Sequence, residues 1–110
     1  MVARYETGLG GDGMAQVRIM YWKESPYAVR ASEGNERASR QLPTEFQEAI
    51  DAAAMFDGDT AAEAYQAGFR WGPPEERPGT AASVAEAVVA EIVTAFPGER
   101  LARLARREAT

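Results

Sequence analysis

The fold is decided by residues 16–31, which read QVRIMYWKESPYAVRA. The first half of this stretch is rich in β-branched and aromatic residues, and its alternation places Val17 and Ile19 on one face of an expected strand. Turn chemistry follows in the letters ESP, and residues 27–31 alternate again. The stretch therefore predicts a β-hairpin. Because a two-stranded hairpin is marginally stable by itself, other elements must cover one of its faces.

Beyond the hairpin the apolar period changes from two residues to 3.6, which predicts helices. Four helices are expected, over residues 43–57, 60–71, 81–96 and 98–107. The first has its apolar stripe around Phe46 and Ile50 and ends at Gly58. Capping-box spacing at Thr60 and at Ser83 is expected to open the second and third helices. The predicted fold class is α+β, with the hairpin packed against three or four helices.

Three segments lack a regular period and are expected to be irregular. Residues 1–13 have four glycines in their last six positions and predict a flexible arm ahead of a single domain over residues 14–110. Residues 32–40, SEGNERASR, are polar and predict a loop. Residues 72–79, GPPEERPG, contain three prolines and predict a stiff linker between helices.

The composition excludes most familiar catalysts. The chain has no cysteine and no histidine, so it lacks thiolate and imidazole nucleophiles, disulfides and the usual zinc or haem ligands. Glu45, Glu48 and Asp51 lie close together on the first expected helix, but acidic residues near a helix N-terminus commonly favour its dipole while remaining solvated. We therefore expect no enzymatic activity, no metal and no cofactor.

Two short motifs resemble ligand-binding sites but lack the surrounding sequence that such sites need. Residues 8–13, GLGGDG, match G-x-G-x-x-G, but a strand follows them where a dinucleotide site needs a helix. Residues 57–59, DGD, resemble the start of a calcium loop, yet Ala61 and Ala62 occupy later ligand positions. Both motifs are better explained as an arm and as a junction between helices.

Charge and hydropathy limit the partners. The net charge is −5, and residues 41–96 carry ten acidic and two basic side chains. Because phosphate neutralisation supplies much of the affinity for nucleic acid, this charge balance disfavours a nucleic-acid partner. No apolar stretch approaches the roughly 18 residues that a membrane span needs, so we expect no membrane partner and a cytoplasmic location.

Four residues are candidates for an interaction surface: Trp22, Lys23, Asp51 and Met55. Alternation places Tyr21 and Trp22 on opposite faces of the strand, so one ring should be core and the other could anchor a partner. On a helical wheel centred on Phe46, Asp51 and Met55 lie roughly 140° and 180° away, on the outer face. An exposed methionine beside a charge is typical of adaptable protein-binding surfaces.

Several phrases together resemble a known family. Residues 21–26 read YWKESP, residues 46–55 read FQEAIDAAAM, and ERL stands at residues 99–101. From about Met14 to Arg106 the chain is similar to the small bacterial domain family called virulence factor, although Lys23 stands where arginine is expected. The resemblance implies a small intracellular bacterial domain, found alone or at the end of a larger conserved virulence protein, whose molecular activity is not established.

Three functions follow as hypotheses. The leading one is a non-enzymatic accessory or protein-interaction domain with a protein partner. The second is a small-molecule or cofactor-binding accessory subunit of a larger enzyme, which needs a concave pocket between hairpin and helices. The third is a nucleic-acid-binding regulator that uses Trp22, Lys23, Arg40 and the arginines of the last helix.

Overall fold

The structure is a computed structural model that describes residues 13–107, so the predicted arm lies, except for Gly13, outside the described residues. The described part is a five-stranded antiparallel sheet with four helices, which confirms the predicted α+β class. The elements in chain order are β1 (Met14–Trp22), β2 (Ser25–Glu33), β3 (Glu36–Gln41), α1 (Thr44–Asp57), α2 (Ala62–Ala67), β4 (Phe69–Trp71), β5 (Glu75–Pro78), α3 (Ala81–Ala95) and α4 (Gly98–Ala105).

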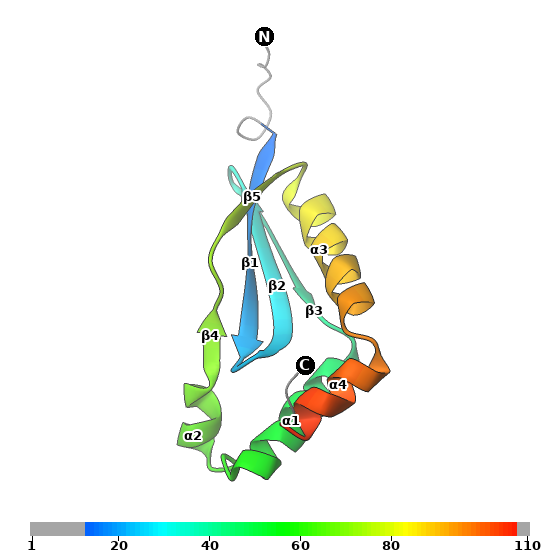
Figure 1. The fold of residues 1–110 in the computed structure, drawn as a ribbon. Helices are drawn as coiled ribbons and strands as arrows, with labels where there is room; N and C mark the ends of the chain where they lie inside the picture. Colours follow the sequence, from blue (N-terminus) through cyan, green and yellow to red (C-terminus); the bar gives the residue numbers. More distant parts are fainter. Residues whose placement is uncertain (1–12, 108–110) are drawn as a thin grey trace.

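β1 is the central strand of the sheet (Figure 1). On one side it pairs with β2, and β3 pairs with the far edge of β2. On its other side β1 pairs with β5 near its start and with β4 near its end. The predicted hairpin is therefore the β1–β2 pair, longer than expected at both ends, within a larger sheet. A register shift between Met20 and Tyr21 interrupts this pair near its turn.

Helices cover one face and one end of the sheet. α3 packs across β1, β2 and β3, while α1 and α4 lie side by side at the lower end (Figure 1). The main core joins the inward residues of the sheet, such as Val17 and Val29, to Val84 and Val88 of α3. Burying each valine stabilises the fold by about 1.5–3 kcal/mol. A smaller second cluster surrounds Trp22 and Ile50.

The loop predicted for residues 32–40 is wrong, because this segment completes β2 and forms β3. Gly34 has φ +58 and stands first in the two-residue turn between the strands, the position that favours glycine in a type II′ hairpin. Ala38 is buried, whereas the residues beside it are exposed. A polar edge strand with one small inward residue has too little apolar alternation to be distinguished from a loop.

The chain between α1 and α3 also differs from the prediction. The helix expected over residues 60–71 is shorter, and its end is replaced by β4. The segment predicted as a linker, residues 72–79, contains β5. Its prolines permit this strand: two of them lie in the break between β4 and β5, and Pro78 ends an edge strand, where a missing N–H is tolerated. The predicted capping boxes are wrong as well: Thr80 and Ser83 form the box that opens α3, and α2 has no side-chain cap.

Candidate interaction surface

Trp22 is fully buried, so its ring belongs to the core and does not lie on an exposed surface. Its indole Nε1 donates a hydrogen bond of 2.7 Å to the backbone oxygen of Tyr65, and the two rings stack with centroids 5.8 Å apart. The bond satisfies the one polar group of the indole. Trp22 therefore joins the end of β1 to α2.

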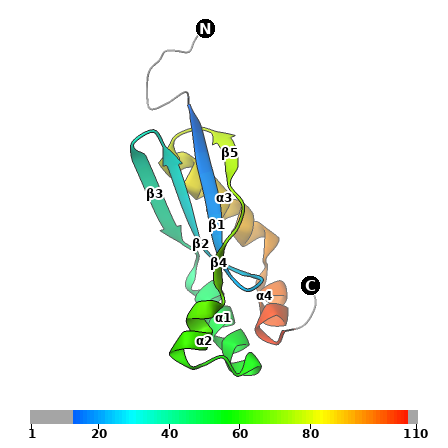
Figure 2. The same cartoon turned by 90° about the vertical axis from the view of Figure 1, so that its left-hand side faces the viewer.

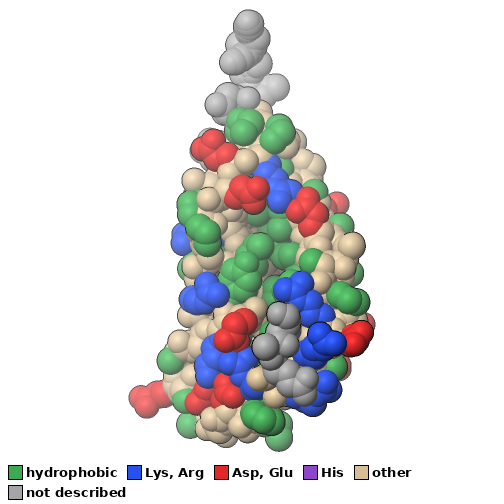
Figure 3. Space-filling view, viewed as in Figure 1, with side chains coloured by type: hydrophobic (Ala, Val, Ile, Leu, Met, Phe, Trp, Pro, Cys, Tyr) green, Lys and Arg blue, Asp and Glu red, His purple; other side chains and the backbone are tan. Residues whose placement is uncertain are grey.

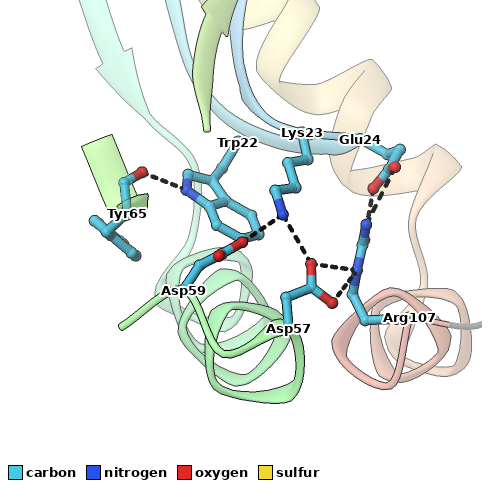
Figure 4. A network of polar contacts seen from close by, with 7 residues as sticks. All are labelled: Trp22, Lys23, Glu24, Asp57, Asp59, Tyr65 and Arg107. Carbon is cyan, nitrogen blue, oxygen red and sulfur yellow. Dashed lines mark hydrogen bonds and ion pairs between the residues drawn. The ribbon is translucent and has the colours of Figure 1, made fainter. Parts of the chain in front are cut away.

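Lys23 lies in the turn after β1 and contacts the end of α1 (Figure 4). Its Nζ donates to Asp57 Oδ2 at 2.9 Å and to Asp59 Oδ2 at 2.6 Å. The Lys23 backbone N–H donates to the oxygen of Gly68 at 2.8 Å. Its φ is +52, a left-handed conformation that non-glycine residues adopt rarely. The ammonium group is thus engaged within the chain.

Arg107 extends this network from the residues after α4 (Figure 4). Its guanidinium contacts Glu24 at 2.5 Å and Asp57 at 3.0 Å. Asp57 therefore lies between two cations, one from the β1–β2 turn and one from the C-terminal end of α4. The network fixes the last turn of α1 from two sides.

The charges in this network favour one another's ionised forms. The Lys23 ammonium, followed by Arg107, lowers the pKa of Asp57 below its ordinary value. Arg107 likewise lowers the pKa of Glu24, and the hydrogen bonds that Lys23 donates to Asp59 and Asp57 raise the pKa of Lys23. Asp57, Glu24 and Lys23 are therefore charged at neutral pH, and protonation of the two carboxylates in acid weakens the network.

The outer face of α1 has the predicted phase. Phe46, Ala49, Ile50 and Ala53 are buried, whereas Asp51 and Met55 are exposed. The Asp51 carboxylate accepts hydrogen bonds from Gln47 Nε2 at 2.9 Å and from the Tyr65 hydroxyl at 3.1 Å. Asp51 thus links α1 to α2 and still faces solvent.

Phe56 is a candidate that sequence reasoning missed. Its exposed fraction is 68 %, against 70 % for Met55, so two consecutive large apolar side chains are exposed at the end of α1, about 100° apart around the helix axis. On the helical wheel Phe56 lies about 80° from Phe46, at the border of the buried stripe. Whether Phe56 is buried therefore depends on whether a neighbouring element reaches the end of α1 and covers it. The helical period alone does not determine this. The four predicted residues are not brought together: Met55 and Asp51 face outward, while Trp22 and Lys23 face the fold.

Two concave regions border the helices. A groove of about 490 Å³ lies between α1, α4 and the end of α3, with Phe46, Phe96 and Leu101 among its apolar lining and Glu45 and Glu48 beside them. A hollow of about 350 Å³ lies between β1, the segment after β4 and α3. Figure 3 shows apolar side chains gathered in the hollow at the centre of this face. Concavities of this size are within the range of small-ligand pockets.

Among residues 13–107, no group of three or more acidic side chains is arranged to hold a metal ion. In the same range, none of the helices is by itself long and apolar enough to cross a membrane. α3 and α4 would meet the length and composition requirement only as a pair, and they are bent by 79° relative to each other.

Comparison with known protein families identifies the chain's family. The family described as "Virulence factor" matches residues 20–105, which include all four helices and most of the sheet. No curated protein and no solved structure matches the chain significantly.

Proposed function

The chain belongs to the virulence factor family, and we propose that it acts there as a non-enzymatic protein-binding domain that contacts its partner through the end of α1. One observation carries this proposal: Met55 and Phe56, consecutive residues at the end of α1, expose 70 % and 68 % of their surface. Single exposed apolar residues are common, but adjacent large ones resemble the anchors of protein interfaces.

The surroundings of this pair support a binding role. Asp57 follows Phe56 directly and is held by Lys23 and Arg107, so the apolar pair stands on a fixed helix end. A preorganised anchor loses less conformational entropy on binding than a mobile one. The ion network therefore holds in place the end of α1 that carries Met55 and Phe56.

The charge beside the pair specifies the partner's chemistry. Glu48, Asp51 and Met55 follow at helical spacing on the exposed side of α1, so an acidic stripe leads to the apolar pair. A complementary partner has an apolar pocket for Met55 and Phe56 and basic residues along one rim. We therefore propose a protein with a basic-rimmed apolar groove.

The non-enzymatic part of the proposal rests on the residue types present. The chain has neither cysteine nor histidine. The carboxylates that come closest to a cluster on α1, Glu45, Glu48 and Asp51, are all exposed, whereas catalytic carboxylates are typically desolvated or closely paired.

A site-specific crosslinking experiment tests the proposal. Because the chain has no cysteine, Ala52→Cys on the exposed side of α1 creates a single thiol beside Met55 and Phe56. The purified variant is labelled at this thiol with a photo-crosslinker and mixed with an extract of the native host. The matched control is Thr94→Cys on the exposed side of α3. We expect a protein that crosslinks from position 52 and not from position 94, and that binds the unmodified chain when purified.

Binding by purified components then decides the outcome. We expect Met55→Glu with Phe56→Glu to weaken binding of the captured protein at least tenfold, with an unchanged melting temperature. Val93→Glu is the control, since Val93 is exposed on α3. Unchanged binding by the Met55/Phe56 variant, or equal loss in the control, would contradict the proposal.

A second candidate function is favoured by the hollow between β1 and α3. Its apolar floor, which includes Val17 and Ile19, could hold a small apolar ligand. The test uses the dye 1-anilinonaphthalene-8-sulfonate as a probe. If the hollow binds it, Ala95→Trp, which fills the hollow, removes saturable fluorescence, whereas Ala90→Trp on exposed α3 surface does not. Equal fluorescence in both variants would reject this candidate.

A further inference from the structure

The face of the sheet opposite α3 is separate from the end of α1 and carries its own pattern. Figure 2 shows the sheet from this side, with α3 behind it. Cross-strand register places Arg18, Arg30 and Ser39 next to one another on β1, β2 and β3. Their side chains are exposed, and within residues 13–107 no helix lies over this part of the face.

Three arginines form a row across this face. Arg18 on β1 is directly opposite Arg30 on β2. Arg37 on β3 is opposite Ser32, which lies two residues after Arg30 on β2, so Arg37 is a diagonal neighbour of Arg30 on the same face. Neighbouring strands are about 4.8 Å apart, and diagonal neighbours about 7–8 Å. The three guanidinium groups can therefore meet consecutive charges of one extended anion.

These arginines lack carboxylate partners among the described residues. Arg18 Nε donates to the backbone oxygen of Gly72 at 3.2 Å, and in the described range no ion pair joins Arg18, Arg30 or Arg37 to an acid. By contrast, Arg77 and Arg107 each bind carboxylates. Like charges directly opposite in a sheet are destabilising, so a bound anion would relieve the repulsion between Arg18 and Arg30.

An aromatic surface adjoins the row. The half-buried ring of Trp71 lies 5.5 Å from the Arg18 guanidinium carbon and 4.8 Å from that of Arg30, measured to its centroid. Trp71 pairs with Met20, which lines a cavity of about 430 Å³. The cavity is otherwise lined by three aromatic rings and two amides, from Tyr27, Tyr65, Phe69, Gln47 and Gln66.

We propose that this face binds single-stranded nucleic acid, with phosphates along Arg18, Arg30 and Arg37 and a base in the aromatic cavity. A single strand alternates anionic groups with planar polar rings, and this face places guanidinium groups next to aromatic rings and amides. An acidic peptide would match the arginine row but supplies no ring for the cavity.

The net charge of −5 is compatible with this site. The acidic residues concentrate between residues 41 and 96, while the arginine row lies on β1, β2 and β3. Glu76 lies at the far end of the face, opposite Gln16, and Asp51 lies beside the cavity, where its carboxylate accepts hydrogen bonds from Gln47 and Tyr65. Repulsion from the rest of the chain disfavours duplex DNA, whose charge density is higher than that of a single strand. We therefore expect preference for single strands.

Fluorescence anisotropy with the intact chain tests the proposal, using labelled 12-residue single-stranded oligonucleotides, a duplex of the same sequence and a poly-glutamate peptide of equal charge. We expect the single strand to bind more tightly than either competitor. Three phosphate contacts predict a slope of about −2 for log affinity against log salt concentration.

Two variants localise the binding. Arg30→Gln with Arg37→Gln should weaken oligonucleotide affinity at least tenfold, while Arg100→Gln with Arg103→Gln, on α4, alters the net charge equally and should leave it within about twofold. Circular dichroism confirms that both variants are folded. No binding of single strands, equal loss in both variants, or tighter binding of duplex or poly-glutamate would overturn the proposal.

Discussion

The indole of Trp22 lies directly against Gly68, so that a Cβ atom added to this glycine would be 2.6 Å from the ring atom Cε2. The backbone of residues 65–68 therefore approaches the ring more closely than any side chain at position 68 would permit. The same approach places the backbone oxygen of Tyr65 where it accepts the indole hydrogen bond.

Gly68→Ala is expected to destabilise the protein by about 1–3 kcal/mol, because the buried ring has no space into which to move. For a domain of this size, each kcal/mol lowers the melting temperature by roughly 4–8 °C. Gly98→Ala is the control, since nothing lies within 4 Å of a Cβ at that position. A similar melting temperature for both variants would show that the Trp22 contact is not close in solution.

Thr80→Ala should cost about 1 kcal/mol through loss of the cap at the start of α3. The Thr80 hydroxyl oxygen accepts from the Ser83 backbone N–H at 3.1 Å. Thr94→Ala, on the exposed side of the same helix, makes the same chemical change without a cap and should be neutral or slightly stabilising. Denaturant midpoints of the two variants measure the difference, and equal midpoints would contradict the role of Thr80.

The network at Asp57 predicts an acid-dependent loss of stability. Because the folded pKa values of Asp57 and Glu24 lie below their ordinary values of 3.8 and 4.5, the unfolded chain takes up these protons first as the pH falls. Their contribution is therefore complete above the ordinary pKa values and is lost as the pH falls through the folded ones. Arg107→Met should show a smaller fall in melting temperature than the natural chain over this range.

The control for this pH dependence is Arg103→Met, which removes an exposed pair with Glu99 four residues away on α4. Such pairs contribute little, so the variant should retain the acid sensitivity of the natural chain. If Arg107→Met and Arg103→Met respond to acid alike, the network does not produce the effect.

The left-handed backbone of Lys23 gives a prediction separate from its charge. Lys23→Gly and Lys23→Val both remove the ammonium group, but only valine is strained at φ +52. The glycine variant should therefore be the more stable by about 1 kcal/mol. Urea unfolding of the two proteins measures this difference, and a more stable valine variant would mean that the turn relaxes to another conformation.

Much of the helical part of the fold could be predicted from the sequence, because helical burial follows a local period. Phe46 and Ile50 in α1, and Val84 and Val88 in α3, are buried as their spacing predicts. The strands after β2 could not be predicted, because β4 has only three residues and β3 has only one buried residue. Their stability comes from pairing with partners distant in sequence, which no local pattern records.

The candidate surface was likewise predicted only where a local period determines it. The outward position of Met55 follows from helical phase alone. The engagement of Lys23 with Asp57 joins residues 34 positions apart. Trp22 is buried by residues of α1 and by Tyr65 of α2, an element whose limits were themselves mispredicted. Trp71 gave no signal, because its significance depends on Arg18 and Arg30 from two other strands.

The central position of β1 has a consequence for the order in which the chain folds. Its pairing with β2 closes a two-residue turn. Its pairing with β5, of Val17 with Glu75 for example, closes a much longer loop that contains the intervening strands and two helices. Closing the longer loop costs more chain entropy, and contacts distant in sequence slow folding. We therefore expect the β1–β2–β3 meander to form first and β4 and β5 to dock on it later. The backbone amides of β1 that bond to β4 and β5 should then be the last to become protected from hydrogen exchange during refolding.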